Sequence, residues 1–216
     1  MDDERQEILW ADMLEIKSFG YLIRAKIEQN LSLVISNISS SFMGNRQLAN
    51  HNTDDVKYNL NKICSIKFDK NEVLPKLVQL KFLKHREKLN KQLISNSAAM
   101  LDAVENLQEV HKKIMKTNEE VIKFNSEIIN LSTKLLADEN LDSNYNLDSE
   151  AINIELDSLE KKCVKSRRDC QKLTKKVDVV FSQNLESQQT ILNKRQKIMK
   201  NRKNISETRK QINLFL

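Results

Sequence analysis

One uninterrupted stretch near the end of the chain decides the fold, running from Ile152 to Phe215: INIELDSLEKKCVKSRRDCQKLTKKVDVVFSQNLESQQTILNKRQKIMKNRKNISETRKQINLF. Apolar residues recur in steps of four and three, and neither Gly nor Pro interrupts them. With Leu156 taken as position a, the a positions are Leu156, Cys163, Cys170, Val177, Asn184, Ile191, Ile198, Ile205 and Ile212. A repeat of about 3.5 residues held over so many turns is typical of a supercoiled helix. The stretch therefore predicts a long coiled-coil helix that needs a partner.

The composition of the whole chain favours long helices with narrow apolar stripes. Hydrophobic residues make up 39% and charged residues 31% of the 216 residues, with two Gly and one Pro. A sheet or a compact bundle of many helices needs more turns than these Gly and Pro residues supply. We therefore predict an all-α, elongated fold of long coiled-coil helices with a small N-terminal helical cluster.

The compartment is indicated by the cysteines and by the first residues. Three cysteines form no paired framework, which favours a reducing compartment. The N-terminal sequence MDDERQE is acidic, unlike a secretory signal or a transit peptide. No run of about 18 apolar residues occurs, so we expect no membrane span. These features predict a protein of the cytosol or the nucleus.

Four segments can be distinguished along the chain. Residues 1–68 carry a broad apolar pattern that predicts helix, and the polar, Asn-rich sequence near 44–55 predicts a loop within them. Residues 72–137 hold a second heptad array and predict coiled coil 1. Residues 138–150 are acidic and predict a linker to coiled coil 2, residues 151–216, which has a basic C-terminal part.

The sequence leaves two arrangements of the coiled coils open. Their similar lengths and the linker between them permit an antiparallel hairpin. They equally permit an interrupted rod that lies parallel to a second chain. Asn184 at an a position favours the rod, because a buried Asn is a register device found most often in parallel two-stranded coils.

The a and d positions of both coils are the candidate partner interface, because a seam of this kind is buried only against another helix. In coiled coil 1 the candidates are Leu107, Val110, Ile114, Val121, Phe124, Ile128 and Leu131. In coiled coil 2 they are Leu173, Val177, Val180, Ile191, Ile198 and Ile205. We expect a hetero-oligomer held by these residues.

Positive charge is concentrated at the end of the chain. The formal net charge is +6, and from Gln188 onward eight Lys or Arg accompany one acid, Glu207. Cations on one helix can neutralise phosphates or face an acidic partner. Candidate residues for nucleic-acid or acidic-partner contact are Lys194, Arg195, Lys197, Lys200, Arg202 and Lys203. Basic-zipper readers place the basic region before the zipper, whereas these cations lie inside and after the seam.

No motif for catalysis, cofactor binding or metal binding is present. His51, His85 and His111 are far apart and are not spaced with Cys or acids as metal ligands are. Two glycines in total exclude a Gly-rich phosphate loop. We therefore expect a protein that is not an enzyme and has no cofactor and no metal.

Part of coiled coil 1 resembles the central coil of the centromere protein H family. The matching segments are ISNSAAMLD, residues 94–102, and LQEVHKKIMK, residues 107–116. The shared pattern is an Ile-Ser start with small residues, an Asp, a Leu-x-Glu step and a closing Lys-x-Ile-Met-Lys. The C-terminal part departs from the family, because it lacks the Trp-containing segment of animal members.

The resemblance implies a non-catalytic scaffold subunit of the constitutive inner kinetochore, on centromeric chromatin in the nucleus. It also implies pairing with a long coiled-coil subunit like centromere protein K and association with a helical-repeat subunit like centromere protein I. The contact with centromeric chromatin would be indirect. The residues alone leave two alternatives, a basic coiled-coil protein that contacts DNA directly and a cytoskeletal (spindle) or vesicle-tethering subunit.

Overall fold

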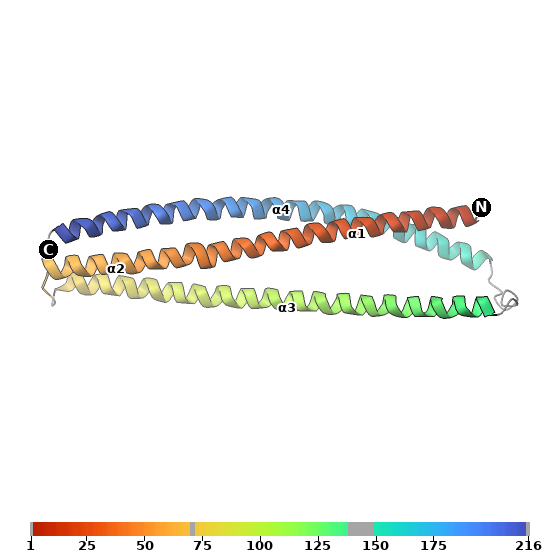
Figure 1. The fold of residues 1–216 in the computed structure, drawn as a ribbon, viewed down its shortest axis with the longest axis horizontal. Helices are drawn as coiled ribbons and strands as arrows, with labels where there is room; N and C mark the ends of the chain where they lie inside the picture. Colours follow the sequence, from red (N-terminus) through yellow and green to blue (C-terminus); the bar gives the residue numbers. More distant parts are fainter. Residues whose placement is uncertain (1, 70–71, 138–148, 215–216) are drawn as a thin grey trace. The chain divides into compact units, whose positions relative to one another are not determined.

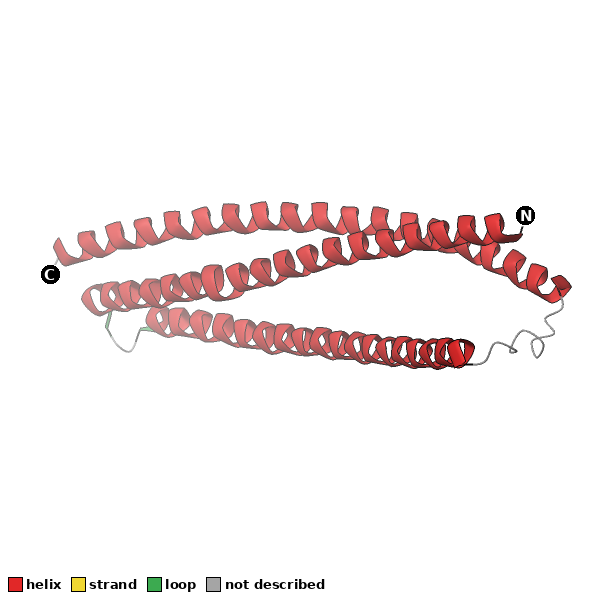
Figure 2. Ribbon diagram, turned by 45° about the vertical axis from the view of Figure 1, so that its right-hand side comes forward, coloured by secondary structure: helices red, strands yellow, loops and turns green. Residues whose placement is uncertain are grey.

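The computed structural model describes residues 2–69, 72–137 and 149–214, and this part of the chain contains helices and no strand (Figures 1 and 2). The prediction of an all-α fold built from long helices is confirmed. The elements in chain order are α1 (Asp2–Ser39), the π-helix η1 (Ser40–Arg46), α2 (Gln47–Lys67), α3 (Val73–Ala137) and α4 (Ser149–Leu214).

Each of the two heptad arrays forms one long helix. α3 covers the predicted coiled coil 1 from its second residue to its last, and α4 begins two residues before the predicted coiled coil 2. The last two residues of the expected linker, Ser149 and Glu150, are therefore helical. Glu150 suits this position because an acidic side chain is favourable in the first turn of a helix. The remaining linker residues, 138–148, lie outside the described residues.

The chain divides into two compact units. Unit 1 contains Met1–Asn71 and Ser149–Leu216, and unit 2 contains Glu72–Asp148. Unit 1 thus brings α1, η1 and α2 together with α4, although more than 80 residues of sequence separate α2 from α4. Unit 2 contains α3.

Within unit 1, α4 runs beside α1, η1 and α2 in the same direction (Figures 1 and 2). Arg5 bonds to Glu160 near one end of the pair, and Asn59 bonds to the carbonyl of Ile205 near the other. Because both partners advance together along the chain, the two helices are parallel. Neither arrangement proposed from the sequence included this pairing of residues 2–67 with α4 within one chain.

One cluster of buried apolar residues in unit 1 lies near the N-terminal ends of α1 and α4. Leu9, Leu156 and Cys163 are buried together there. Four partly buried residues pack against them, namely Met13, Ile16, Ile152 and Leu159. Cys163 is a free thiol and fills its a position as a small apolar side chain. At the beginning of α4, the a and d side chains therefore pack against α1, as the seam of a coiled coil packs against its partner.

Residues 44–55 are helical, which corrects the predicted loop. They form the end of η1 and the first part of α2, so the backbone is helical from Asp2 to Lys67. Asn45 and Asn52, which suggested a turn, are buried and bonded to α4. The N-terminal segment also departs from the expected small cluster, because it is a long helical rod paired with α4. Its extra apolar residues, such as Trp10, remain exposed.

Candidate interaction surfaces

Five buried asparagines, here called the asparagine ladder, join the two helices of unit 1. Each side-chain Nδ2 donates a hydrogen bond to a main-chain carbonyl of α4, over distances from 2.8 to 3.2 Å. The donors are Asn30, Asn37, Asn45, Asn52 and Asn59, and the acceptors in the same order are Val177, Asn184, Ile191, Ile198 and Ile205. No ladder Asn is more than 8% exposed. A buried amide is tolerated when it is hydrogen-bonded, and so short a side chain reaches a carbonyl only where two backbones lie close.

The π-helix η1 keeps the ladder in register. The acceptors on α4 are seven residues apart throughout, whereas Asn37 and Asn45 are separated by eight. A π-helical turn holds more residues than an α-helical turn, so it can absorb one extra residue. The separation in sequence between donor and acceptor accordingly falls from 147 residues at Asn37 to 146 at Asn45. η1 therefore allows residues 2–67 to follow the unbroken heptad of α4.

Ion pairs across unit 1 are concentrated in its N-terminal half. Arg5 bonds to Glu160 at 2.6 Å and also to Asp157. Arg167 reaches Asp12 at 2.9 Å and Glu15. A further ion pair joins Lys26 and Asp178 at 2.8 Å. Near the other end, Arg209 pairs with Asp55 at 2.6 Å.

The ion pairs of Arg5 and Arg167 shift the pKa of Arg5, Asp157, Glu160 and Arg167. Hydrogen bonds from Arg5 hold the pKa of Asp157 and of Glu160 below their ordinary values, and the two carboxylates raise the pKa of Arg5. The hydrogen bond to Asp12, with the nearby charges, raises the pKa of Arg167. Arg5, Asp157, Glu160 and Arg167 therefore stay ionised at neutral pH. Because they lie at the surface, they orient the helices more than they stabilise them.

The structure places the predicted interface residues of α4 within unit 1. Val177 is buried, and the three isoleucines that accept ladder bonds are half-buried. The d residues Leu173 and Val180 are 43% and 38% exposed. Most of this predicted set therefore contacts the rod of residues 2–67 in the same chain.

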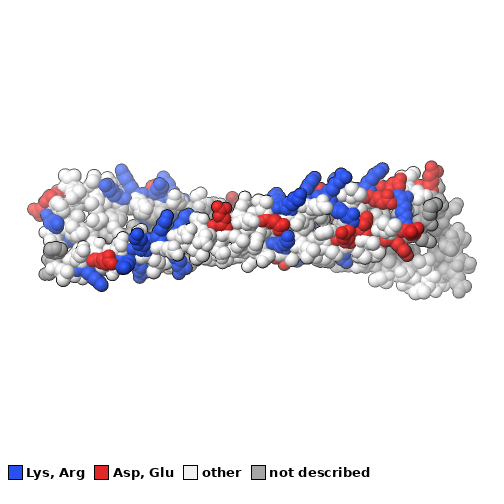
Figure 3. Space-filling model, turned by 90° about the horizontal axis from the view of Figure 1, so that it is seen from above, with Lys and Arg blue, Asp and Glu red and all other residues white. Residues whose placement is uncertain are grey.

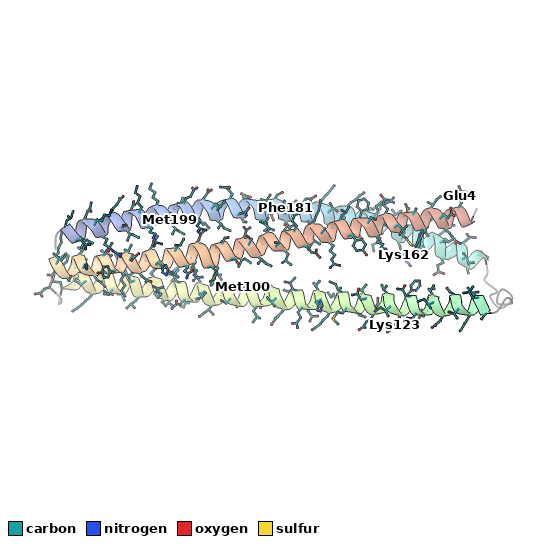
Figure 4. All side chains as sticks on the ribbon, in the orientation of Figure 1. Glu4, Met100, Lys123, Lys162, Phe181 and Met199 are labelled. Atoms are coloured by element: carbon teal, nitrogen blue, oxygen red, sulfur yellow. The ribbon has the colours of Figure 1, made fainter. Side chains whose placement is uncertain are left out.

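The predicted interface residues of α3 have a different environment, because α3 has no buried residue. Leu131 is half-buried. The other six, Leu107, Val110, Ile114, Val121, Phe124 and Ile128, are exposed, and Phe124 reaches 60%. Figure 4 shows side chains projecting from α3 between Met100 and Lys123, where every residue is exposed. Within unit 2, the seam of α3 is thus an apolar surface with no buried residue.

A second apolar row lies beside this seam and was missed by the sequence analysis. Taking Met100, Ile114, Val121, Ile128 and Leu135 as a positions of α3, the members of this row each follow one of them by one residue and are exposed: Leu101, Met115, Ile122, Ile129 and Leu136. Their spacing in multiples of seven was visible in the sequence. The seam and this row together are here called the α3 stripe. A stripe wider than the a and d positions suits packing against more than one helix.

All six predicted contacts for nucleic acid or an acidic partner are exposed on α4. On the face drawn in Figure 3, Lys and Arg occur toward both ends, whereas acidic residues are more frequent toward the end opposite to the one where α4 finishes. Met199, labelled in Figure 4, marks the basic part of the helix, and Phe181 precedes it. The structure therefore leaves these cations accessible.

The described helices lack both a cluster of metal-ligating side chains and a membrane span. No group of three His, Cys, Asp or Glu side chains in residues 2–69, 72–137 and 149–214 could hold a metal ion. Over the same ranges, every helix is too polar or too short to cross a membrane.

Comparisons of the chain with models of protein families, with curated proteins and with solved structures found no match.

Proposed function

We propose that the protein is a non-catalytic scaffold subunit that binds a partner coiled-coil subunit through the α3 stripe. The observation that supports this proposal is that α3 has no buried residue although it carries an apolar stripe along its length. Helices in proteins gain most of their stability from packing an amphipathic face. Fully burying one Val, Leu, Ile or Phe side chain contributes about 1.5–3 kcal/mol. A partner that covers the stripe would therefore bind with a large hydrophobic contribution.

The width of the stripe favours a partner that supplies two helices. The a and d positions alone form the narrow seam of a two-stranded coil. The second row, which includes Ile122 and Ile129, lies to one side of that seam and needs a second covering surface. We therefore infer that α3 lies in the groove between two helices of the partner assembly.

The assembly that we propose is the constitutive inner kinetochore. This part of the proposal is supported by the resemblance of residues 94–116 to the centromere protein H family. It names a coiled-coil subunit like centromere protein K as the partner on the stripe, and a helical-repeat subunit like centromere protein I as a further neighbour. The protein would then act in the nucleus, at the centromere.

The stripe is tested by the double variant Ile114→Asp with Val121→Asp in the full chain. Two carboxylates in the buried interface would lack partners, which costs several kcal/mol. We expect affinity for the partner, measured by co-purification and titration, to fall at least about a hundredfold. The matched control is Ser126→Asp with Asn130→Asp, which adds the same charge at exposed positions away from the stripe. Equal binding by the two variants would contradict the proposed interface.

The identity of the assembly is tested by purifying the tagged protein from cells and identifying its partners by mass spectrometry. We expect centromeric subunits, and fluorescence of the tagged protein at centromeres. Recovery of spindle or vesicle-tethering proteins instead would contradict the kinetochore assignment and leave the interface on α3 in place.

A further inference from the structure

The two ends of unit 1 differ in how far their cations are neutralised. Residues 2–39 and 149–187 together contain twelve Lys or Arg and fourteen Asp or Glu. Residues 40–67 and 188–214, here called the basic end, also contain twelve Lys or Arg but only three Asp or Glu. The excess of positive charge at the basic end is thus due to its small number of acidic residues. It extends over η1 and α2 as well as α4.

The register of the two helices explains where the acids are missing. Arg209 follows the ladder acceptor Ile205 by four residues, and it pairs with Asp55, four residues before Asn59. The same rule places Arg202 opposite Leu48. One heptad earlier, it places Arg195 opposite Ser41. Neither Leu48 nor Ser41 can neutralise an arginine, and within the described residues Arg195 and Arg202 form no ion pair.

The ladder also shows that these two arginines are not used inside unit 1. Arg209 Nε donates to Asn59 Oδ1 at 3.2 Å, in addition to its bond with Asp55. The corresponding oxygens of Asn45 and Asn52 are buried without a hydrogen-bond partner. Arg195 and Arg202 therefore do not donate to these two asparagine oxygens, and both arginine side chains are exposed to solvent. Seven residues of helix separate them by roughly 10 Å.

The neighbouring side chains favour a phosphate backbone over an acidic helix. A helical partner packs along a continuous apolar row, but here the d positions Lys194, Asn201 and Thr208 are polar. In the row that follows the a positions, this end of α4 exposes Leu192 and Met199, and Ser206 then interrupts the row. The aromatic rings of this end are also occupied. Arg46 lies over Phe42, and both Lys62 and Arg209 lie over Tyr58, at 5.2–5.4 Å from the ring centres. Unpaired bases, which bind by stacking on free aromatic rings, are therefore less suited than a duplex.

We propose that the basic end of unit 1 binds the sugar-phosphate backbone of duplex DNA, with Arg195 and Arg202 as the central contacts. We expect binding that is independent of base sequence, because the proposed contacts are to phosphates, which carry no sequence information. The exposed lysines of the same part of α4, such as Lys200 and Lys203, extend the surface. The choice of DNA over RNA rests on the proposed function at chromatin.

The test is fluorescence anisotropy of a labelled duplex of about 30 base pairs with the full chain, between about 50 and 200 mM salt. We expect Arg195→Glu with Arg202→Glu to weaken binding about tenfold or more. The slope of log affinity against log salt should fall by about 1.8, since each lost phosphate contact contributes about 0.9. A second variant, Lys200→Glu with Lys203→Glu, lies away from the ladder and should also weaken binding. It keeps the test decisive if the arginine variant unfolds.

The matched control is Lys161→Glu with Lys165→Glu, an equal change of charge at exposed positions of α4 outside the basic end. We expect this variant to bind DNA like the unmodified chain. An equal loss in this control, or no loss in either variant of the basic end, would overturn the proposal.

Competition distinguishes the other possible ligands. We expect duplex DNA to bind at least as tightly as an RNA duplex of equal length, and polyglutamate of equal charge to compete poorly. Tighter binding of RNA, or efficient displacement by polyglutamate, would overturn the assignment to DNA. Ile114→Asp with Val121→Asp should lose the partner and keep DNA affinity, so failure of the proposed function and failure of this surface give different results.

Discussion

Asparagine side chains at the seam of unit 1 act as core residues because each is given a hydrogen-bond acceptor. A helical carbonyl already accepts one bond from its own helix and has a second lone pair for the ladder. The five ladder residues do not have equal surroundings, however. Asn59 also accepts from Arg209 Nε, whereas Asn52 Oδ1 is buried without a partner. Asn30 resembles Asn59, because its Oδ1 accepts from Asn184 Nδ2 at 3.1 Å.

This difference predicts unequal costs for two identical substitutions. Asn52→Ala removes one hydrogen bond and one unsatisfied oxygen, so we expect a loss of about 1 kcal/mol or less in the free energy of unfolding. Asn59→Ala removes two hydrogen bonds, and we expect a loss of about 2 kcal/mol. The gain in helix propensity from Ala is common to both and cancels in the comparison. Chemical denaturation measures the difference, and equal losses would contradict a role for the Arg209 bond.

The ladder also marks where residue-level prediction succeeded and failed. Asn184 at an a position favoured a rod parallel to a second chain, whereas in the structure it lies in a parallel pair within one chain, in which its carbonyl accepts from Asn37. Asn45 and Asn52 predicted a loop, because Asn is ordinarily a turn residue and is rarely buried. The spacing of seven, eight, seven and seven among the five asparagines was present in the sequence. A search for polar residues in heptad register, allowing one extra residue, would have found it.

At the scale of elements, η1 reconciles two helices whose repeats differ by one residue. The heptad of α4 is unbroken, whereas the seam of residues 2–67 contains one extra residue between Asn37 and Asn45. Without η1, Asn45, Asn52 and Asn59 would be rotated away from their acceptors by about 100°. The irregular helix is therefore a consequence of pairing with α4.

Deleting Met43, which is exposed within η1, should convert residues 2–66 of the shortened chain into one regular α-helix. The ladder would then have a spacing of seven throughout, so we expect stability to be unchanged or increased, as measured by thermal unfolding. Deleting Gln189 from α4 should have the opposite effect, because the mismatch across the pair would grow to two residues. The loss of the last three ladder bonds would cost about 3 kcal/mol. Similar destabilisation by both deletions would contradict this function of η1.

Helix boundaries were predicted well where apolar periodicity was strong, as in α3 and α4. The pairing of those helices was not predictable in the same way. A heptad seam shows that a helix needs a partner, but it does not say which helix that partner is. In the sequence, the row Leu9, Ile16 and Ile23 of α1 matches the seam of α4 no better than the seam of α3 or of another protein would. Arg5 of α1 pairs with Glu160 of α4, and Arg167 of α4 pairs with Asp12 of α1. The two residues of each pair are 155 apart in sequence, so these ion pairs can be recognised only once the register of the helices is known.

At the scale of the whole molecule, the two units differ in how much of their apolar surface they cover. Unit 1 has buried core residues, a ladder of hydrogen bonds and ion pairs across its two helices. α3 has no buried residue over its 65 residues. The pairing of residues 2–67 with α4 therefore does not require a second protein, whereas burial of the α3 stripe does require a covering surface.

This contrast predicts how three synthetic segments should behave. Segments 1–69 and 149–216, when mixed, should form a helical one-to-one complex, because together they contain the seam and the ladder of unit 1. Dyes on their N-termini should show efficient energy transfer, since the helices are parallel. Segment 72–137 alone should show weak helicity in circular dichroism, because its stripe has no partner. Energy transfer between opposite ends of the first pair would contradict the parallel register. A stable helical oligomer of segment 72–137 alone would show that the α3 stripe pairs with itself, and would replace the proposed partner subunit by a second copy of the chain.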